Sequence, residues 1–208
     1  MTSRRNTPHR RYNYTLVRRW QPLADAEWDA LLPFVLVQNG PGRPLRDARR
    51  RMDAIFWIAT SGSAWHTVPP RFGKPDTIGR HFRRLSHAGL WERLLRALAL
   101  PDAPEALLAL EHWIVRACRR ATRIRGLRIV LLARRLLFRS ALRAPAWMLP
   151  DPDLSEYVHR RLRPVLERIR AGGLRAAALP HPDFFKACGR LLATAAGRRR
   201  IPRCLEPV

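Results

Sequence analysis

Apolar residues recur every three or four positions along most of the chain, the spacing of amphipathic helices. The first such segment covers residues 25–35, where Trp28, Leu31, Leu32 and Val35 recur at this spacing and Pro33 lies near the end. A second helix is expected over 46–62, ended by Gly62, with a short helix over 64–70 after it. A turn at 71–75 then leads to helices over 76–89 and 90–100.

The helical pattern continues beyond a hinge expected at Pro101–Pro104. It predicts helices over 105–124, 127–142, 153–170 and 184–197, which together could form a small helical bundle. The third has the clearest apolar seam, and Asp153 with Glu156 resembles a capping box at its start. The seam consists of Leu154, Tyr157, Val158, Leu162, Val165, Leu166 and Ile169. Since no segment alternates with the period of two typical of strands, the expected fold class is all-α.

The net charge of the chain indicates the class of its binding partner. The chain has 40 Lys+Arg against 16 Asp+Glu, a formal net charge of +24, and 47% hydrophobic residues, enough for a core. So large an excess must lie largely on the surface, which favours a polyanionic partner: nucleic acid first, an anionic membrane second. All basic residues except Lys74 and Lys186 are arginine, which suits phosphate and guanine. A GC-rich gene would produce the same bias.

Residues 44–89 follow the order of a helix-turn-helix module, in which a second helix enters the major groove of DNA. On a helical wheel Ile78, Phe82 and Leu85 share one face and should pack on Met52, Phe56 and Trp65. The opposite face carries the candidate DNA-binding residues Thr77, Arg80, Arg83, Arg84 and His87. Arg43, between Gly42 and Pro44, is a candidate for the minor groove. An ordinary solvated basic face and a plain loop remain the alternatives.

The same residues give no sign of catalysis. Cys118, Cys188 and Cys204 form no C-x-x-C pair, and His112 and Cys118 are six positions apart, which places them on different faces of a helix. No metal, cofactor or catalytic residue is therefore expected. The start of the chain lacks an apolar signal segment and no stretch reads as a membrane span. The expected location is cytoplasmic, associated with the nucleoid and not with a membrane.

A set of motifs with consistent order and spacing resembles a known family. They are D-x-E-W at Asp25–Trp28, G-R-P at Gly42–Pro44, R-x-x-x-D-A-I at Arg49–Ile55, S-G-x-x-W at Ser61–Trp65, P-x-R-F-G at Pro69–Gly73 and W-E-R-L at Trp91–Leu94. This stretch, about residues 20–95, resembles the N-terminal domain of insertion-sequence-five-type bacterial transposases. The resemblance implies a helical module that holds the terminal inverted repeats of a transposon.

The chain departs from that family at single positions and in its second half. Ala24 replaces a usual hydroxyl cap, and Gly79 and Leu85 replace usual aromatics; Gly79 implies a loosened helix or a close approach to the DNA backbone. The resemblance also implies an Asp-Asp-Glu triad that holds two metal ions on an α/β domain. Such carboxylates would stand at the ends of strands, but none of the acidic residues beyond residue 100 follows a strand-like segment. These acids are Asp102, Glu105, Glu111, Asp151, Asp153, Glu156, Glu167, Asp183 and Glu206.

We therefore expect a flexible basic arm over 1–19, a helix-turn-helix DNA-binding domain over 20–100 and a basic helical region of unknown role over 101–208. That last region would pack on the DNA-binding domain, add phosphate contacts or form a homodimer. The surface for this role would come from Arg119, Arg120, Arg123, Arg134 and Arg135. The expected function is DNA binding without a nuclease centre. The alternatives are a transposase completed by a separate Asp-Asp-Glu polypeptide, a truncated remnant, and a basic protein that binds membranes or ribosomes without sequence preference.

Overall fold

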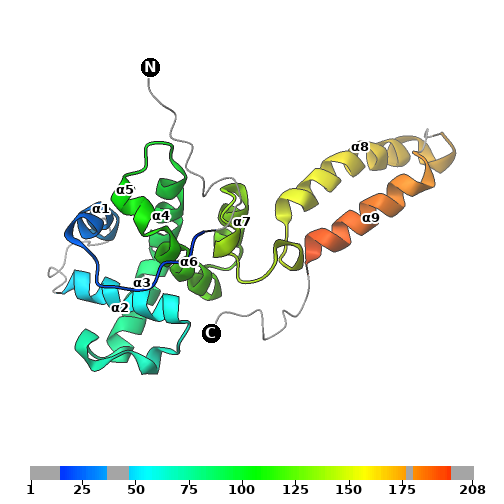
Figure 1. Cartoon of the computed structure of the whole chain (residues 1–208). Helices are drawn as coiled ribbons and strands as arrows, with labels where there is room; N and C mark the ends of the chain where they lie inside the picture. Colours follow the sequence, from blue (N-terminus) through cyan, green and yellow to red (C-terminus); the bar gives the residue numbers. More distant parts are fainter. Residues whose placement is uncertain (1–14, 37–46, 177–179, 198–208) are drawn as a thin grey trace, which may run out of the picture. The chain divides into compact units, whose positions relative to one another are not determined.

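Helices account for all the regular structure in the part of the chain that the computed structural model describes, residues 15–36, 47–176 and 180–197 (Figure 1). Within these ranges there is no strand, so the all-α expectation is confirmed. The chain divides into two compact units after Arg143.

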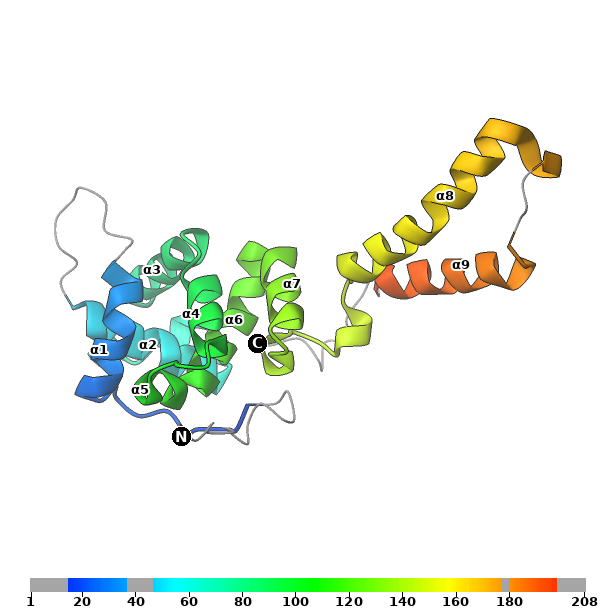
Figure 2. The same ribbon diagram turned by 90° about the horizontal axis from the view of Figure 1, so that it is seen from above.

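The first unit holds seven of the helices, arranged around α6. They are α1 (Asp25–Leu36), α2 (Ala48–Ser61), α3 (Pro75–His87), α4 (Leu90–Ala99), α5 (Glu105–Ala109), α6 (Glu111–Arg125) and α7 (Leu127–Arg135). Helix α6 packs against α2, α3, α4 and α7 (Figures 1 and 2). Its Trp113 and the rings of Phe56 and Trp91 form the aromatic centre of the core, and all three are fully buried. The core is thus shared between the two sides of the expected hinge at Pro101–Pro104.

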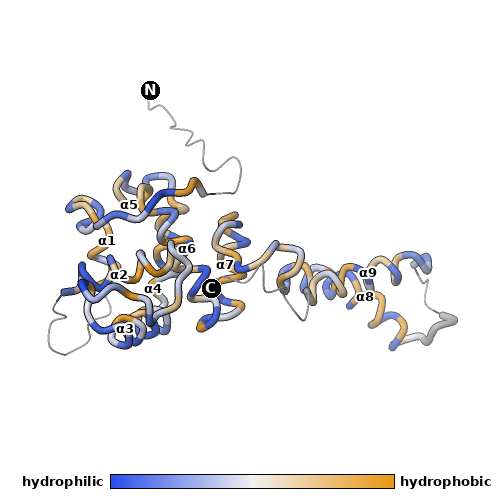
Figure 3. Tube along the Cα trace, turned by 60° about the horizontal axis from the view of Figure 1, so that its bottom comes forward, coloured by the Kyte–Doolittle hydropathy of each residue, from blue (hydrophilic) through white to orange (hydrophobic). Residues whose placement is uncertain are grey.

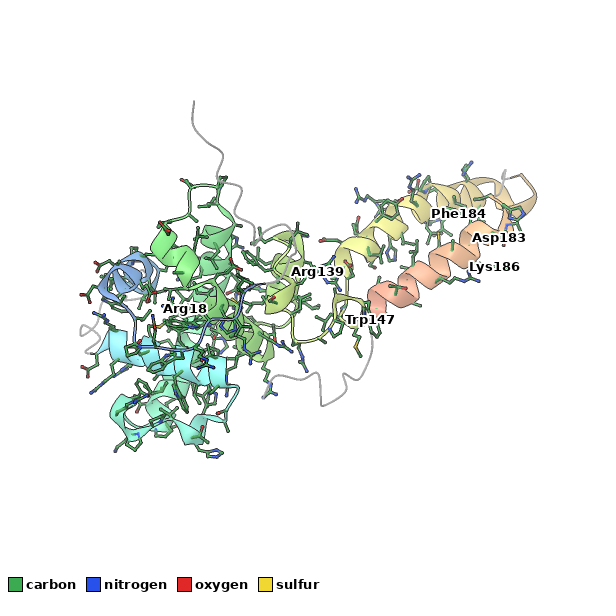
Figure 4. All side chains as sticks on the ribbon, in the orientation of Figure 1. Arg18, Arg139, Trp147, Asp183, Phe184 and Lys186 are labelled. Atoms are coloured by element: carbon green, nitrogen blue, oxygen red, sulfur yellow. The ribbon has the colours of Figure 1, made fainter. Side chains whose placement is uncertain are left out.

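The segment just before α1 is held on the helices by one arginine. Arg18 pairs with Glu27 of α1 at 2.7 Å, donates to the Ala109 carbonyl of α5 at 2.8 Å and lies over the ring of Trp113 of α6 (Figure 4). Residues 15–19 therefore differ from the flexible arm expected over 1–19, whose first 14 residues lie outside the described ranges. Glu27 also accepts from the Ala24 backbone N–H at 3.0 Å. One half of a capping box thus persists at α1 although Ala24 has no hydroxyl.

Two arginines of α6 satisfy the carbonyl end of α2. The last carbonyls of a helix have no partner within it. Arg116 donates to the Ala59 carbonyl at 3.2 Å, and Arg120 donates to the carbonyls of Ile58 at 3.3 Å and Ser63 at 2.8 Å. Gly62 allows the left-handed turn there, with φ of 71°. Arg120 is therefore engaged inside the unit, and its expected role in a phosphate-binding surface is wrong.

The second unit is an antiparallel pair of helices, α8 (Pro152–Ala176) and α9 (Pro182–Ala196) (Figures 1 and 2). The four helices expected beyond residue 100 thus do not form one bundle, because those before Arg143 belong to the first unit. Hydrophilic and hydrophobic residues alternate along both helices (Figure 3). Val158 and Val165 of the expected seam are buried, whereas Tyr157 and Leu166 are exposed because a single helix covers only a narrow stripe.

The start of α8 is capped two residues earlier than the sequence indicated. Asp151 accepts the Leu154 backbone N–H through Oδ1 at 3.1 Å, and its own N–H donates to the Ala195 carbonyl of α9 at 2.8 Å. The expected capping box of Asp153 with Glu156 is wrong, since Pro152 already begins the helix and Asp153 lies inside its first turn. Proline suits this first position because its missing N–H would have no partner there.

Candidate nucleic-acid interface

Helix α3 turns one face to the core and the other to solvent, as its sequence predicted. Ile78, Phe82 and Leu85 are buried, and the ring of Phe82 lies 5.1 Å from that of Trp65 and 5.4 Å from that of Trp91. The strong amphipathic pattern of this helix therefore fixes its rotation about its own axis.

Gly79 belongs to the buried face of α3. A Cβ at this position would lie 3.7 Å from the Trp65 ring, which is ordinary van der Waals contact. Gly79 is therefore packed inside the protein, and the expectation that it lets a DNA backbone approach α3 is wrong.

The five candidate residues on α3 all lie on its exposed side. Arg80 pairs with Asp76 one turn earlier at 2.6 Å, and both side chains are well exposed. Arg84 lines a hollow together with Arg51 of α2 and contacts the buried His81. The structure thus brings together Thr77, Arg80, Arg83, Arg84 and His87. The sixth candidate, Arg43, lies outside the described residues.

The connection between α2 and α3 differs from the short turn of a standard helix-turn-helix. It runs from Gly62 to Lys74 and contains two 3-10 turns, Trp65–Thr67 and Pro70–Phe72. The usual turn has only about three or four residues. Trp65 of the first turn packs on Phe82, so the longer connection is part of the support of α3.

A small hollow lies between α2 and the exposed side of α3. Arg51 of α2 lines it together with Thr77, Arg80, His81 and Arg84 of α3, and its volume is about 270 Å³. Desolvation by burial, followed by the charges of Arg84 and Arg51, lowers the pKa of His81 to about 4. This ring is therefore neutral at physiological pH, and the other charged residues that line the hollow are three arginines.

Sequence reasoning did not identify Arg51, because it reaches this hollow through the packing of α2 on α3. It also missed a second basic hollow, of about 400 Å³, lined by residues of α4, α6 and α7 and the turns beside them. Its arginines are Arg93, Arg96, Arg125, Arg128 and Arg135. Arg125 donates to the buried carboxylate of Glu92 at 2.7 Å, so this wall is held together by an ion pair.

The W-E-R-L motif supports the interface rather than forming it. Trp91 donates through Nε1 to the Ser86 hydroxyl at the end of α3 at 2.8 Å. Glu92 pairs with Arg125, and Arg93 donates to the carbonyls of Ala88 and Phe34 at 2.7 and 3.2 Å. The motif thereby fixes the end of α3 relative to α1, α4 and α6.

The remaining candidate chemistry lies apart from this surface. His112 donates through Nδ1 to the Arg18 carbonyl at 3.0 Å, and burial lowers the pKa of its ring. Cys118 is fully buried, and desolvation raises the pKa of its thiol. The described part of the chain holds no group of three or more His, Cys, Asp or Glu residues placed around a common metal position. In the same residues no helix combines the length and apolar character of a membrane span.

Comparison with known proteins matches part of the first unit to a family. Residues 23–95 match the family described as "Putative transposase of IS4/5 family (DUF4096)". The chain is also 31% identical over 96 residues to the uncharacterized protein y4sN of Sinorhizobium fredii (strain NBRC 101917 / NGR234). The aligned residues make up 46% of this chain and 76% of that protein. No solved structure matches the chain. The chain belongs to this IS4/5 transposase family, and membership supports a transposase-related function.

Proposed function

We propose that this protein is a DNA-binding component of an insertion-sequence system, which recognises duplex DNA such as the terminal inverted repeats through the exposed side of α3. The observation that carries the proposal is the arrangement of Thr77, Arg80, Arg83, Arg84 and His87 on one side of a helix whose other side is locked in the core. A helix presented in this way can enter the major groove, where arginine pairs with guanine and the surrounding charge binds phosphates.

The packing around α3 supports this proposal because base reading requires a rigid helix. Phe82 lies between the rings of Trp65 and Trp91, and Trp91 in turn bonds to Ser86 at the end of the helix. These contacts hold the exposed arginines at fixed spacing along α3. The connection of α2 to α3 makes this, in our proposal, a variant of the helix-turn-helix with an extended turn.

In this proposal the chain binds DNA but does not cleave it. Strand cleavage during transposition would be carried out by a separate polypeptide with an Asp-Asp-Glu triad. Several acids beyond residue 100 have structural partners that account for them. Glu111 accepts the Thr15 hydroxyl at 2.6 Å, Asp151 caps α8, and Asp183 lies beside Lys186 at 3.6 Å at the start of α9 (Figure 4).

The test is a comparison of duplexes at fixed salt. Purified protein is titrated against fluorescent duplexes that carry the inverted repeats flanking its gene and against a scrambled duplex of equal length. Specific readers prefer their sites by at least ~10³-fold, and we expect the repeats to be preferred by at least this ratio. Equal affinity for both duplexes would refute sequence recognition and leave only a polycation.

Two variants locate the reading surface. Arg83→Gln removes an exposed arginine of α3 and should reduce the preference for the repeats by about 5–150-fold, equivalent to about 1–3 kcal/mol for one base contact. Arg160→Gln removes an exposed arginine of α8 and serves as the control, because it has the same charge change in the other unit. Equal effects of the two changes would exclude α3 as the reading helix.

A further inference from the structure

We infer that the hollow between α2 and α3 is a seat for one phosphate group of the DNA backbone. It is formed by Arg51, Thr77, Arg80, His81 and Arg84. The inference rests on the proposed function and deepens it, because it separates a phosphate-binding part of the surface from the part that reads bases.

The groups around the hollow match the chemistry of a phosphate. Three arginines and Thr77 line a hollow of about 270 Å³, which has room for a group larger than one water molecule. Guanidinium binds phosphate oxygens in pairs, and a hydroxyl adds a further donor. A phosphodiester group thus finds donors on both walls, from α2 and from α3.

The positive charge of the hollow is only partly balanced within the protein. Asp76 pairs with Arg80 at 2.6 Å on the exposed rim. In the part of the chain that the structure describes, the Arg51 side chain forms no hydrogen bond or ion pair, although it is half-buried next to Arg84 and His81. A bound anion would relieve the repulsion among these like charges.

His81 positions Arg84 rather than touching the phosphate. Its ring is buried, and Nδ1 lies 3.1 Å from Nη2 of Arg84. Because guanidinium has donors only, Nδ1 accepts this bond and the ring proton sits on Nε2. The depressed pKa of His81, about 4, keeps the ring in this accepting form. The neutral histidine therefore holds the Arg84 guanidinium at the wall of the hollow.

With this phosphate seat, the exposed residues of α3 would have two separate roles, binding the DNA backbone and reading base edges. Arg51 and Arg84 would contact the backbone, which fixes orientation but carries no sequence information. Arg83 does not line the hollow and remains available for base edges. The two classes of contact therefore predict different effects of mutation.

The first test is the salt dependence of binding to a 24-bp duplex of mixed sequence, with the full chain, between 50 and 200 mM NaCl. Loss of one phosphate contact lowers the slope of log K against log salt by about 0.9, and Arg51→Gln should show this reduction. Arg50→Gln is the matched control, because Arg50 is exposed on the same helix, pairs with Asp47 and lies outside the hollow. It should change the slope by less than half as much. Circular dichroism melting checks that both variants fold.

The second test addresses His81 as a positioning residue. His81→Asn places an amide oxygen near the position of Nδ1 and should keep the wild-type slope, whereas His81→Leu removes the acceptor and should lower it. NMR titration of the wild-type His81 ring with inorganic phosphate, against sodium chloride of equal ionic strength, should show saturable shifts. These shifts should be lost in Arg51→Gln.

The outcomes separate this inference from the proposed function. Arg51→Gln should weaken repeat and scrambled duplexes by the same factor and leave their ratio unchanged. If Arg51→Gln and Arg50→Gln give the same slope of log K against log salt, the hollow is not a phosphate seat, even if the wild-type protein prefers the repeats. Saturable phosphate binding without a change of slope would mean a site for free phosphate and would also overturn it. If Arg51→Gln reduces the slope but the wild-type protein shows no preference for the repeats, the phosphate seat is supported and sequence recognition is refuted.

Discussion

The buried His81 should make the stability of the first unit depend on pH. Desolvation of its ring, with the nearby charges of Arg84 and Arg51, lowers the pKa from 6.5 to about 4 in the folded state. The unfolded chain then binds more protons than the folded one between these two values. The contribution of His81 to stability is therefore fully present above pH 6.5, falls as the pH drops below 6.5, and is exhausted only near pH 4.

The size of this effect follows from the two pKa values. A separation of about 2.5 units at 1.36 kcal/mol per unit gives about 3 kcal/mol in total. At pH 5 the linkage relation gives a loss of about 2 kcal/mol relative to pH 7.5. This is a large fraction of the roughly 5–15 kcal/mol by which domains are usually stable.

The assay is urea unfolding from pH 7.5 to 4.5, followed by tryptophan fluorescence in buffers without phosphate. The quantity of interest is the difference between wild type and His81→Asn, since other groups, including His112, titrate in both proteins. His66→Asn is the control, because His66 is exposed on the 3-10 turn before α3. A difference curve for His81→Asn that stays flat, or one that equals the curve for His66→Asn, would refute a buried neutral histidine.

Three further expectations concern the packing of each unit. Arg125→Leu leaves the buried Glu92 carboxylate without its partner and should lower the free energy of unfolding by about 3–5 kcal/mol in urea titrations, whereas the same change at the exposed Arg123 should cost far less. Gly197→Ala would place a Cβ 2.7 Å from the backbone at 149–150 with φ of +69°, so hydrogen exchange should rise in α8 and α9 and stay unchanged in α6. The fully buried Cys118, whose thiol pKa is raised by burial, should react with thiol reagents only at the rate of unfolding; fast reaction in the native state would contradict this.

The orientation of α3 could be predicted from sequence because helical periodicity is a local property. The spacing of Ile78, Phe82 and Leu85 was enough to assign the exposed side, and the structure agrees. The same spacing could not show that Arg51 joins Arg84 across two helices, since this depends on tertiary packing. Residue type was equally insufficient for Arg120, because an arginine that contacts phosphate and one that caps a helix have the same chemistry.

Boundaries were harder to predict than helices. Pro101 and Pro104 interrupt the helical pattern, which is a local signal of a break, but α6 beyond them packs against α2, α3 and α4. The seam of α8 was read as continuous, yet Tyr157 and Leu166 are exposed because the unit supplies only α9 to cover it. The proposed roles of the exposed residues of α3, and of Arg43 outside the described ranges, remain predictions.

The bonds from Arg116 and Arg120 to the end of α2 tie the family-matched segment to the sequence that follows it. A change of reading frame anywhere between residues 96 and 115 would replace both arginines together with Trp113 or its neighbours in the core. The carbonyl end of α2 and a large apolar surface would then be left open to water. A frameshift ahead of α6 would therefore disrupt the matched segment as well, so that segment depends on the reading frame of α6 for its fold.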